Sequence, residues 1–388
     1  MQDTPSGLDP HLVSNIQDAT LRGAIYDFLV WNDSNLQPQP ALATSWEATS
    51  DPLSWIFQLR KGVTFHHGTP FTAQDVVHTF DRILGPDFGS TAQTAFQFVE
   101  GVTAIDEYTV EFRLKSANVD LPLLLGDPIN AASIIPHDLS IEELSAQPSG
   151  TGPFRLTEFS PGEKASFTRY ENYWRSGLPH LDGIQHFYMP ELSTQVAALT
   201  SGSIDMIWQL TAEIIPVLEG NPDLVVEEVQ SGAYQPVIMR LDQEPFTDVR
   251  VRQAFKYATD RPAMVQTVLQ GRGVIGNDQP MPPSHPFAAD LPAYDLNIEK
   301  AKTLLAEAGY PDGLEITLYT ADLRPGMVAS AVAFQEMVKA AGVTVQIEQV
   351  PGSNYWSEYW MQNALTISNW SIFPSIDTVL SLIYHSTG

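Results

Sequence analysis

The sequence has no cysteine in its 388 residues. Disulfide bonds, thiolate metal sites and cysteine nucleophiles are therefore excluded. No apolar run approaches the about 18 consecutive residues that a membrane-spanning helix needs. Residues 1–5 also lack the basic and apolar regions of a signal peptide, so we expect any such segment to have been removed from the sequence.

Positively charged residues are scarce. Lys and Arg number 20 against 46 Asp and Glu, which gives a formal net charge of -26. Such a chain repels phosphate backbones and anionic lipid surfaces, so it predicts no nucleic-acid partner. Because the acidic residues are spread along the chain, we interpret them as a solvated surface. Attraction of a cationic solute is the alternative that the composition leaves open.

Motifs for catalysis or cofactor binding are missing as well. The sequence has no phosphate-binding loop, no paired-histidine metalloprotease helix and no serine nucleophile elbow. Gly271, Gly273 and Gly276 match the dinucleotide fingerprint, but a helical pattern precedes them and none follows, so we predict a loop. His66 and His67 are neighbours at a strand end and point to opposite sides, which favours turn histidines over metal ligands. We therefore predict no enzyme, no cofactor and no metal site.

What the chain does have is ample apolar material. Apolar residues make up 43% and charged residues 17%, and the length suits two or three domains. Dense turn-forming residues at 148–153 mark the best internal boundary, and a second boundary is expected near 232–244.

Hydrophobic periodicity predicts alternating helices and strands. In the first half we expect helices over 15–29, 73–84 and 193–201 and strands over 55–59 and 109–114. The helix over 73–84 should have Thr72 as its N-cap and Asp75 at its third position. We also expect a hairpin of 154–159 with 165–170 and a strand after 202–205. In the second half we expect helices over 249–258 and 262–269, a helix over 298–308 ended by Gly309, a strand over 314–319, a helix over 327–341 ended by Gly342 and a strand over 343–350. The last strand, helix and strand imply a mostly parallel sheet with a right-handed crossover, and hence the α/β class.

Aromatic residues gather late in the sequence. The cluster consists of Tyr355, Trp356, Tyr359, Trp360, Trp370 and Phe373. Three of its members stand at helical spacing, which favours core packing for at least half of the cluster. The alternative is a stacking wall or a cage for a cation, because aromatic faces attract ammonium groups.

Arg324 directly follows the predicted strand over 314–319 and precedes a helix. Side chains at the carboxyl end of a parallel strand commonly face a crevice. A guanidinium there can hold a ligand carboxylate through two hydrogen bonds. A solvated loop arginine is the other interpretation.

The chain resembles the solute-binding proteins of ABC importers, in the cluster that carries dipeptides, oligopeptides and nickel complexes, most clearly in residues 59–76, LRKGVTFHHGTPFTAQDV. Further segments follow the family pattern in the same order, at 8–10, 25–30, 40–47, 149–154, 170–174, 181–184, 201–205, 245–254 and 301–310. Single motifs of this kind are weak, but so many in the right order are specific.

The resemblance implies an α/β, bilobal, periplasmic-binding-protein-like fold of type II, with mixed sheets, three lobes and a hinge. Lobe I would comprise residues 1–35 and 151–235, the inserted lobe II residues 36–150, and lobe III residues 236–388. The C-terminal part of lobe III would be missing, because family chains normally continue further. Solute would lie between lobes I and III, and hinge closure would bury it.

The implied function is delivery of a small organic solute, peptide-like or another carboxylate or amine compound, to the permease subunits of an ABC importer. The protein would be a monomer in the periplasm or outside the cell. It would meet the membrane only through the permease or through a lost lipid anchor, the latter in a Gram-positive host. The alternative is a peptide-binding sensor or chaperone-like module that is not coupled to an importer.

The expected site departs from that of peptide-binding relatives. They place an aspartate three residues after the tryptophan that Trp370 resembles, where it pairs with the free amino group of a peptide. Here that position is Phe373, which disfavours a simple peptide ligand. Arg324 is similar in placement to an arginine that takes the carboxylate in dipeptide binders. The predicted ligand contacts are Arg324, Tyr355, Trp356, Trp370 and Phe373, with polar contacts from Asn277 and Asp278.

Overall fold

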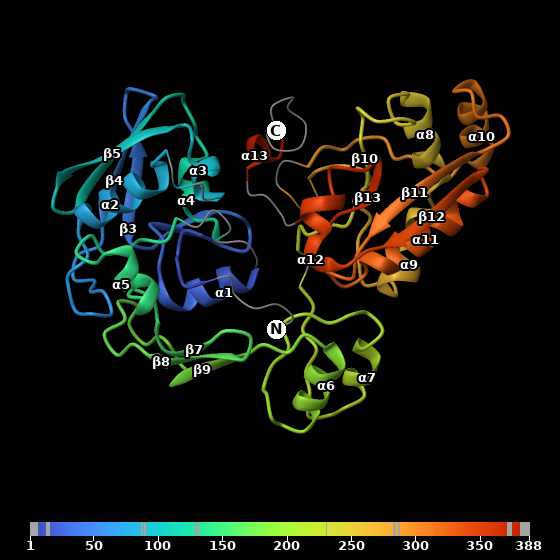
Figure 1. Cartoon of the computed structure of the whole chain (residues 1–388). Helices are drawn as coiled ribbons and strands as arrows, with labels where there is room; N and C mark the ends of the chain where they lie inside the picture. The colour runs from blue at the N-terminus through green and yellow to red at the C-terminus, as the bar shows by residue number, and fades with distance from the viewer. Residues whose placement is uncertain are drawn as a thin grey trace. The chain divides into compact units, whose positions relative to one another are not determined.

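The computed structural model describes residues 7–12, 16–86, 88, 91–128, 132–229, 231–281, 285, 288–370 and 375–380. The chain divides into two compact units, an N-terminal unit that ends at Ile207 and a C-terminal unit that begins at Trp208 (Figure 1). The N-terminal unit contains residues of both predicted lobes I and II. The three-lobe boundaries at 35/36, 150/151 and 235/236 stay predictions.

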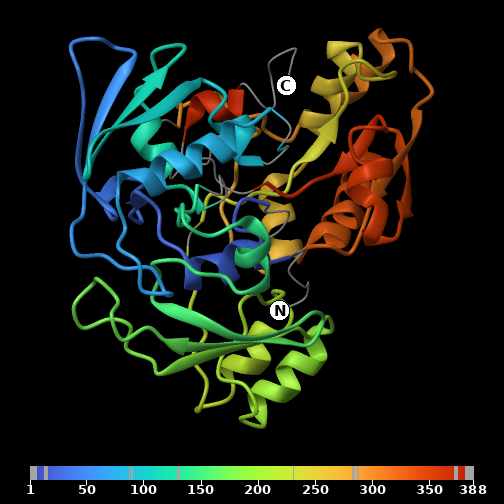
Figure 2. The ribbon, with the colours of Figure 1, turned by 60° about the vertical axis from the view of Figure 1, so that its left-hand side comes forward.

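A four-stranded antiparallel sheet forms one half of the N-terminal unit. Its order is β3 (Ala43–Ala48), β4 (Ser54–Leu59), β6 (Thr109–Leu114) and β5 (Val99–Asp106). Helix α2 (Ala73–Leu84) packs against it, as both views show (Figures 1 and 2). Phe112 is fully buried, and its ring lies 4.8 Å from that of Phe80 and 5.1 Å from that of Phe57. This aromatic packing fixes the helix on the sheet.

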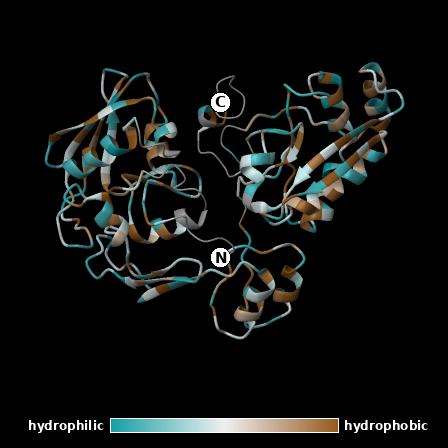
Figure 3. Ribbon diagram, in the orientation of Figure 1, coloured by the Kyte–Doolittle hydropathy of each residue, from teal (hydrophilic) through white to brown (hydrophobic). Residues whose placement is uncertain are grey.

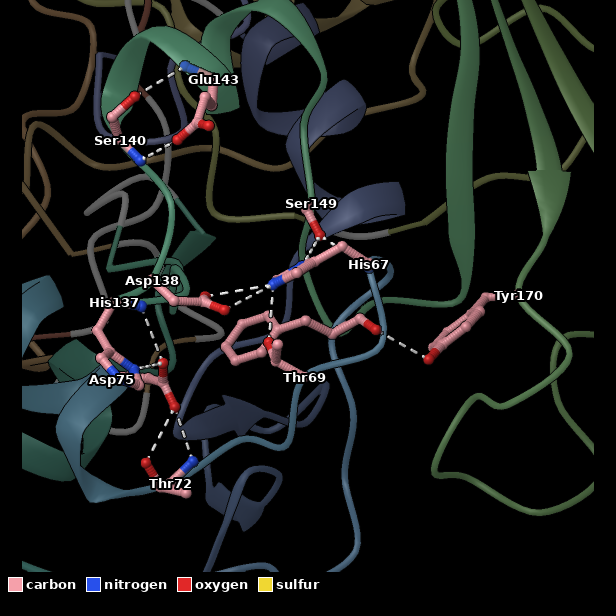
Figure 4. A network of polar contacts seen from close by, with 11 residues as sticks. His67, Thr69, Thr72, Asp75, His137, Asp138, Ser140, Glu143, Ser149 and Tyr170 are labelled. Carbon is pink, nitrogen blue, oxygen red and sulfur yellow. Dashed lines mark hydrogen bonds and ion pairs between the residues drawn. The ribbon is translucent and has the colours of Figure 1, made fainter.

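The helix α2 begins as the sequence predicts. The backbone N–H of Thr72 donates to the Asp75 carboxylate at 2.7 Å, and the Thr72 side chain accepts from the first turn, which completes a capping box. The other oxygen of Asp75 accepts the backbone N–H of His137 at 2.9 Å and lies 2.7 Å from its Nδ1 (Figure 4). Only 1% of the Asp75 side chain is exposed. One carboxylate therefore joins the helix start to the loop at 137.

A second set of contacts lies beside this one (Figure 4). Nδ1 of His67 is 2.6 Å from the Ser149 hydroxyl, and its Nε2 is 3.2 Å from Asp138. We call these three residues together with Thr72, Asp75 and His137 the capping junction. It connects residues 59–76, which carry the strongest family resemblance, to the segment 137–149.

The other half of the N-terminal unit is a three-stranded antiparallel sheet, β7 (Phe154–Ser160), β8 (Lys164–Arg169) and β9 (Gly183–Phe187), seen as green ribbons in Figure 2. This confirms the predicted hairpin. The remaining elements of the unit are α1 (Ile16–Ile25), β1 (Val30–Asn32), β2 (Pro38–Pro40), α3 (Thr91–Ala95), α4 (Leu121–Leu125), α5 (Ile141–Ala146) and α6 (Leu192–Thr200).

Two glycines at the predicted boundary pack directly against the end of α1. A Cβ at Gly150 would lie 2.1 Å from the carbonyl oxygen of Ile25, and one at Gly152 would lie 2.6 Å from the Ile25 carbonyl carbon. The backbone N–H of Gly152 donates to the same carbonyl oxygen at 2.8 Å. Close backbone approach therefore requires glycine here.

Helix α1 is shorter than predicted. It ends at Ile25, because the residues that follow bond to other segments: Leu42 N–H donates to the carbonyl of Phe28, and Ala43 N–H donates to that of Leu29. The apolar pattern of 26–29 reflects burial in an extended segment and not a further helical turn.

The C-terminal unit is built on a mixed sheet of order β10 (Val237–Met239), β13 (Leu365–Ile367), β11 (Leu314–Thr320) and β12 (Val343–Gln349). β11 pairs in parallel with both β12 and β13, whereas β10 is antiparallel to β13. The predicted strand–helix–strand unit is confirmed as β11, α11 (Met327–Lys339) and β12. The other helices are α7 (Ile215–Glu219), α8 (Val249–Ala258), α9 (Arg261–Leu269), α10 (Ile298–Glu307), α12 (Gly352–Asn354), the π-helix η2 (Tyr355–Tyr359) and α13 (Ile376–Val379).

Hydropathy follows this architecture. Brown, apolar residues recur along β11 and α11 in Figure 3, and their buried members include Leu318, Phe334 and Val338. Gly309 and Gly342 follow α10 and α11 with φ of 97° and 89°, a left-handed backbone that favours glycine. Both helix ends are therefore as predicted.

One predicted strand does not form. The strand expected after 202–205 is a turn and coil, since Gly202 has a φ of 72° and most of residues 201–210 are exposed without a neighbouring strand to pair with. The aromatic segment at 355–359 is a π-helix, in which the backbone N–H of Trp360 donates to the carbonyl of Tyr355 at 2.9 Å. This wider turn changes the order of side chains around its axis.

Candidate ligand-binding surface

Three parallel strands of the C-terminal unit end at the same edge of their sheet. β11 is followed by the loop with Arg324, β12 by the turn with Trp356 and Trp360, and β13 by Trp370. Ligands of open α/β sheets bind outside the carboxyl ends of the strands. We call Arg324, Trp356, Trp360 and Trp370 the carboxyl-edge surface.

The three tryptophans form a continuous chain of ring contacts. The ring of Trp360 lies 5.6 Å from that of Trp356 at an interplanar angle of 80°, and 5.8 Å from that of Trp370 at 63°. Trp370 is fixed by two backbone hydrogen bonds of 2.9 Å with Tyr234. Trp356 is 42% exposed. The structure thus shows mutual packing of the tryptophans with one exposed ring at the end, and the stacking wall for a ligand stays a prediction.

The indole N–H of Trp360 is buried and, among the described residues, has no hydrogen-bond partner. A buried donor without an acceptor costs roughly 1–3 kcal/mol, and its presence calls for an explanation. Sequence reasoning put Trp360 in the aromatic cluster but gave it no role. Residue spacing carries no information on which indole remains unpaired after folding.

Tyr355 lies beneath this surface. It is fully buried, and its hydroxyl donates to the carbonyl oxygens of Ile367 and Tyr319. Burial raises its pKa to about 12. The structure gives Tyr355 a packing role that holds η2 on the sheet, so we do not retain it as a direct ligand contact.

Arg324 lies in a loop that packs on the same turn. Its Nη1 donates to the carbonyl of Leu323 at 2.8 Å, and a Cβ at Gly352 would lie 2.6 Å from Leu323 Cδ2. Gln235 donates to the carbonyl of Pro325, on the other side of Arg324. The guanidinium is therefore carried by a loop anchored at both ends.

Asn277 and Asp278 follow α9, both with positive φ, of 53° and 54°. Asp278 accepts from Nη2 of Arg261 at 2.6 Å and lies 3.7 Å from Nζ of Lys256. Asn277 donates to the carbonyl of Leu291 at 3.1 Å. These contacts fix the loop that carries the two residues, and their predicted role as ligand contacts stays a prediction. Phe373, the other predicted contact, lies outside the described residues.

Among the described residues, no helix is long and apolar enough to cross a membrane. That same part of the chain holds no group of three or more His, Asp or Glu side chains arranged to bind a metal ion.

The fold is that of a solute-binding protein. Residues 37–388 match the family described as bacterial extracellular solute-binding proteins, family 5 Middle, and the chain belongs to this family. The predicted relationship and the predicted α/β periplasmic-binding-protein-like fold are thereby confirmed.

Individual relatives carry different ligands. Heme-binding protein A of Haemophilus influenzae is 28% identical over 92% of this chain and 69% of its own length. The periplasmic binding protein DppA of Helicobacter pylori, solved with the peptide STSA, is 25% identical with a TM-score of 0.84, over 97% of this chain and 78% of its own. AgaA from A.tumefacien R10, solved with agropinic acid, is 27% identical with a TM-score of 0.83, over 99% of this chain and 79% of its own.

Proposed function

We propose that this protein binds a small organic solute at its carboxyl-edge surface and delivers it to the permease of an ABC importer. Membership of the solute-binding family supports the delivery role. The observation that carries the site is the placement of Arg324 and three contacting tryptophans after the carboxyl ends of adjacent parallel strands. Binding would change the conformation of the protein, and the permease would distinguish the loaded form from the empty one.

The ligand chemistry follows from the side chains. Arg324 would take a carboxylate, and Trp356 would stack on a flat or apolar part of the solute. The Trp360 N–H would donate to a further acceptor. Phe373 stands where an anion for a free α-amine is expected, which disfavours a simple peptide. The relatives named above bind heme, a peptide and agropinic acid, so membership of the family does not choose the ligand.

The same proposal includes where the protein acts and how it meets the membrane. The protein would act outside the cytoplasm as a monomer, and it would reach the membrane through the permease or a lipid anchor. The relatives are binding proteins, and we propose that this chain also releases its solute chemically unchanged.

Native mass spectrometry of the protein purified from its host tests the proposal first. We expect a bound mass that denaturation releases intact and that identifies the solute. Calorimetry with that solute then compares Arg324→Ala with Arg250→Ala, an exposed arginine of the same unit that pairs with Asp248. Affinity should fall about tenfold or more in the first variant and stay unchanged in the second. Equal affinities would remove Arg324 from the site.

The alternative, a sensor or chaperone-like module, predicts a different outcome. A neighbouring permease gene, or vesicles containing the permease that take up solute only with this protein, would support the importer. Solute binding without any permease-dependent uptake would favour the alternative.

A further inference from the structure

A separate hollow of about 200 Å³ lies in the N-terminal unit. Its walls include Asp27, Phe28, Trp31, Tyr173 and Arg175. None of these residues belongs to the carboxyl-edge surface, which is built entirely from the C-terminal unit. The proposed function therefore gives this hollow no role.

Arg175 brings a positive charge to the hollow, where it also interacts electrostatically with the Asp27 carboxylate. Its guanidinium lies 4.7 Å from the ring centroid of Trp174 and 5.6 Å from that of Trp31. Within the described residues it forms these ring contacts but no ion pair. Aromatic faces hold a guanidinium in place while its N–H donors remain free for an anion. In a chain with 46 acidic residues, such an arginine is available to a ligand carboxylate.

Asp27 brings a carboxyl group with unused capacity. One oxygen accepts from Nε1 of Trp174 at 2.7 Å and from the Thr151 hydroxyl at 3.0 Å. Among the described residues, the other oxygen accepts only from the Tyr173 hydroxyl, at 3.2 Å. A carboxylate offers about four acceptor positions, so the second oxygen has room for one more donor. Burial raises the pKa of Asp27 to about 6, although these three hydrogen bonds and the nearby charge of Arg175 lower it, and a cationic ligand group would further stabilise its ionised form.

The remaining walls include aromatic side chains. Trp31 is 41% exposed and Phe28 is partly buried, so both can cover an apolar ligand stem. The volume equals that of about seven water molecules at about 30 Å³ each, and it is smaller than the roughly 300–1,000 Å³ of sites for larger ligands. A molecule of amino-acid size is the appropriate scale.

We propose that this hollow is a second binding site, for a small zwitterion of the free amino-acid type. Its carboxylate binds Arg175, its ammonium group donates to Asp27, and its apolar stem lies against Trp31. The site is independent of the solute at the carboxyl-edge surface.

Three matched probes test the proposal by ligand-observed NMR and calorimetry. L-leucine has both charges, 4-methylpentanoate lacks the ammonium group, and 3-methylbutylamine lacks the carboxylate. We expect leucine to bind one-to-one and each truncated probe to bind about tenfold more weakly or not at all. Equal binding of the three probes, or no binding of leucine, would overturn the proposal.

Substitutions test whether leucine binds in the hollow or at the carboxyl-edge surface. Arg175→Gln should weaken leucine binding about tenfold, whereas Arg169→Gln, in the same unit and paired with Asp182, should leave it unchanged. Trp31→Leu, on the exposed rim, gives a second measurement of leucine affinity that does not depend on the Asp27 hydrogen bonds. Loss of leucine binding in Arg324→Ala with full binding in Arg175→Gln would assign leucine to the carboxyl-edge surface and refute the second site. That outcome would leave the proposed function intact.

Discussion

The capping junction and the carboxyl-edge surface use their polar groups in opposite ways. In the junction, the Asp75 carboxylate accepts from Thr72 and His137 and is almost fully buried. On the carboxyl-edge surface, the Trp360 N–H is buried without an acceptor among the described residues. The side chains of the junction hold together a segment, residues 59–76, that resembles the family. We propose that ligand recognition depends instead on groups such as the Trp360 N–H.

The largest effect should come from Gly150→Ala beside the junction. The added Cβ would lie 2.1 Å from the carbonyl oxygen of Ile25, and a backbone atom cannot move aside cheaply. We expect a loss of more than about 4 kcal/mol in the free energy of unfolding, measured by urea titration. Gly101→Ala is the control, since its Cβ would meet no atom within 4 Å. Similar unfolding midpoints for the two variants would contradict the close-approach argument.

The second-largest loss of stability should come from Asp75→Ala. It removes the acceptor of two backbone N–H groups and leaves both donors without their partner. We expect about 2–4 kcal/mol of destabilisation in urea unfolding, with solute affinity unchanged in the folded protein. Asp81→Ala, at an exposed position of the same helix, should cost less than about 0.5 kcal/mol. A stable Asp75→Ala protein with weakened solute binding would reverse the roles given to the two regions.

Asp27→Asn should change how stability depends on pH. The pKa of Asp27 rises from 3.8 to about 6 on folding, chiefly through burial, so the folded state holds more protons between these values. Stability contributed by this group therefore falls as the pH rises from about 4 to about 6, by at most about 3 kcal/mol. The asparagine variant lacks this fall, so its stability relative to the parent protein should increase across that window.

Two buried histidines change the pH dependence of stability in the opposite direction, and both are present in the Asp27→Asn variant and in the parent protein. Burial lowers the pKa of His11 to about 3 and that of His66 to about 4, so their contribution to stability rises with pH through the same window. The difference between variant and parent removes their effect. A difference that stays constant from pH 4 to pH 7 would show that Asp27 has no raised pKa.

The smallest effect on stability should come from Trp360→Phe, which keeps an aromatic ring but removes the N–H. We expect an unchanged or slightly raised free energy of unfolding, because a buried unpaired donor is lost. Solute affinity should fall about tenfold in calorimetry. Trp208→Phe, at a position that is 55% exposed in the same unit, should alter neither quantity. A marked loss of stability in Trp360→Phe would mean that its N–H serves the fold.

Much of the fold follows from the sequence. The start of α2 at Thr72 and Asp75 and the ends of α10 and α11 at Gly309 and Gly342 depend on local signals that a sequence displays. The end of helix α1 and the π-helix at Tyr355 depend on contacts with distant segments: helix α1 was predicted too long, and helical spacing alone did not predict a π-helix. Local propensity does not contain those contacts.

The candidate site likewise has some features that the sequence predicts and others that it does not. The predicted strand over 314–319 was enough to place Arg324 after the carboxyl end of β11, whereas the strand β13 that precedes Trp370 was not predicted. Burial of Tyr355, pairing of Asp278 with Arg261 and the unpaired N–H of Trp360 arise only after side chains pack. Residue type and spacing do not show which polar groups will find partners inside the fold.

A crystal structure of the protein with the solute that it carries from its host would show directly whether the carboxyl-edge surface is the ligand site. We predict a solute acceptor atom within about 3.2 Å of the Trp360 indole nitrogen, and a solute carboxylate at Arg324. A solute bound elsewhere, with the Trp360 N–H still unpaired, would contradict it.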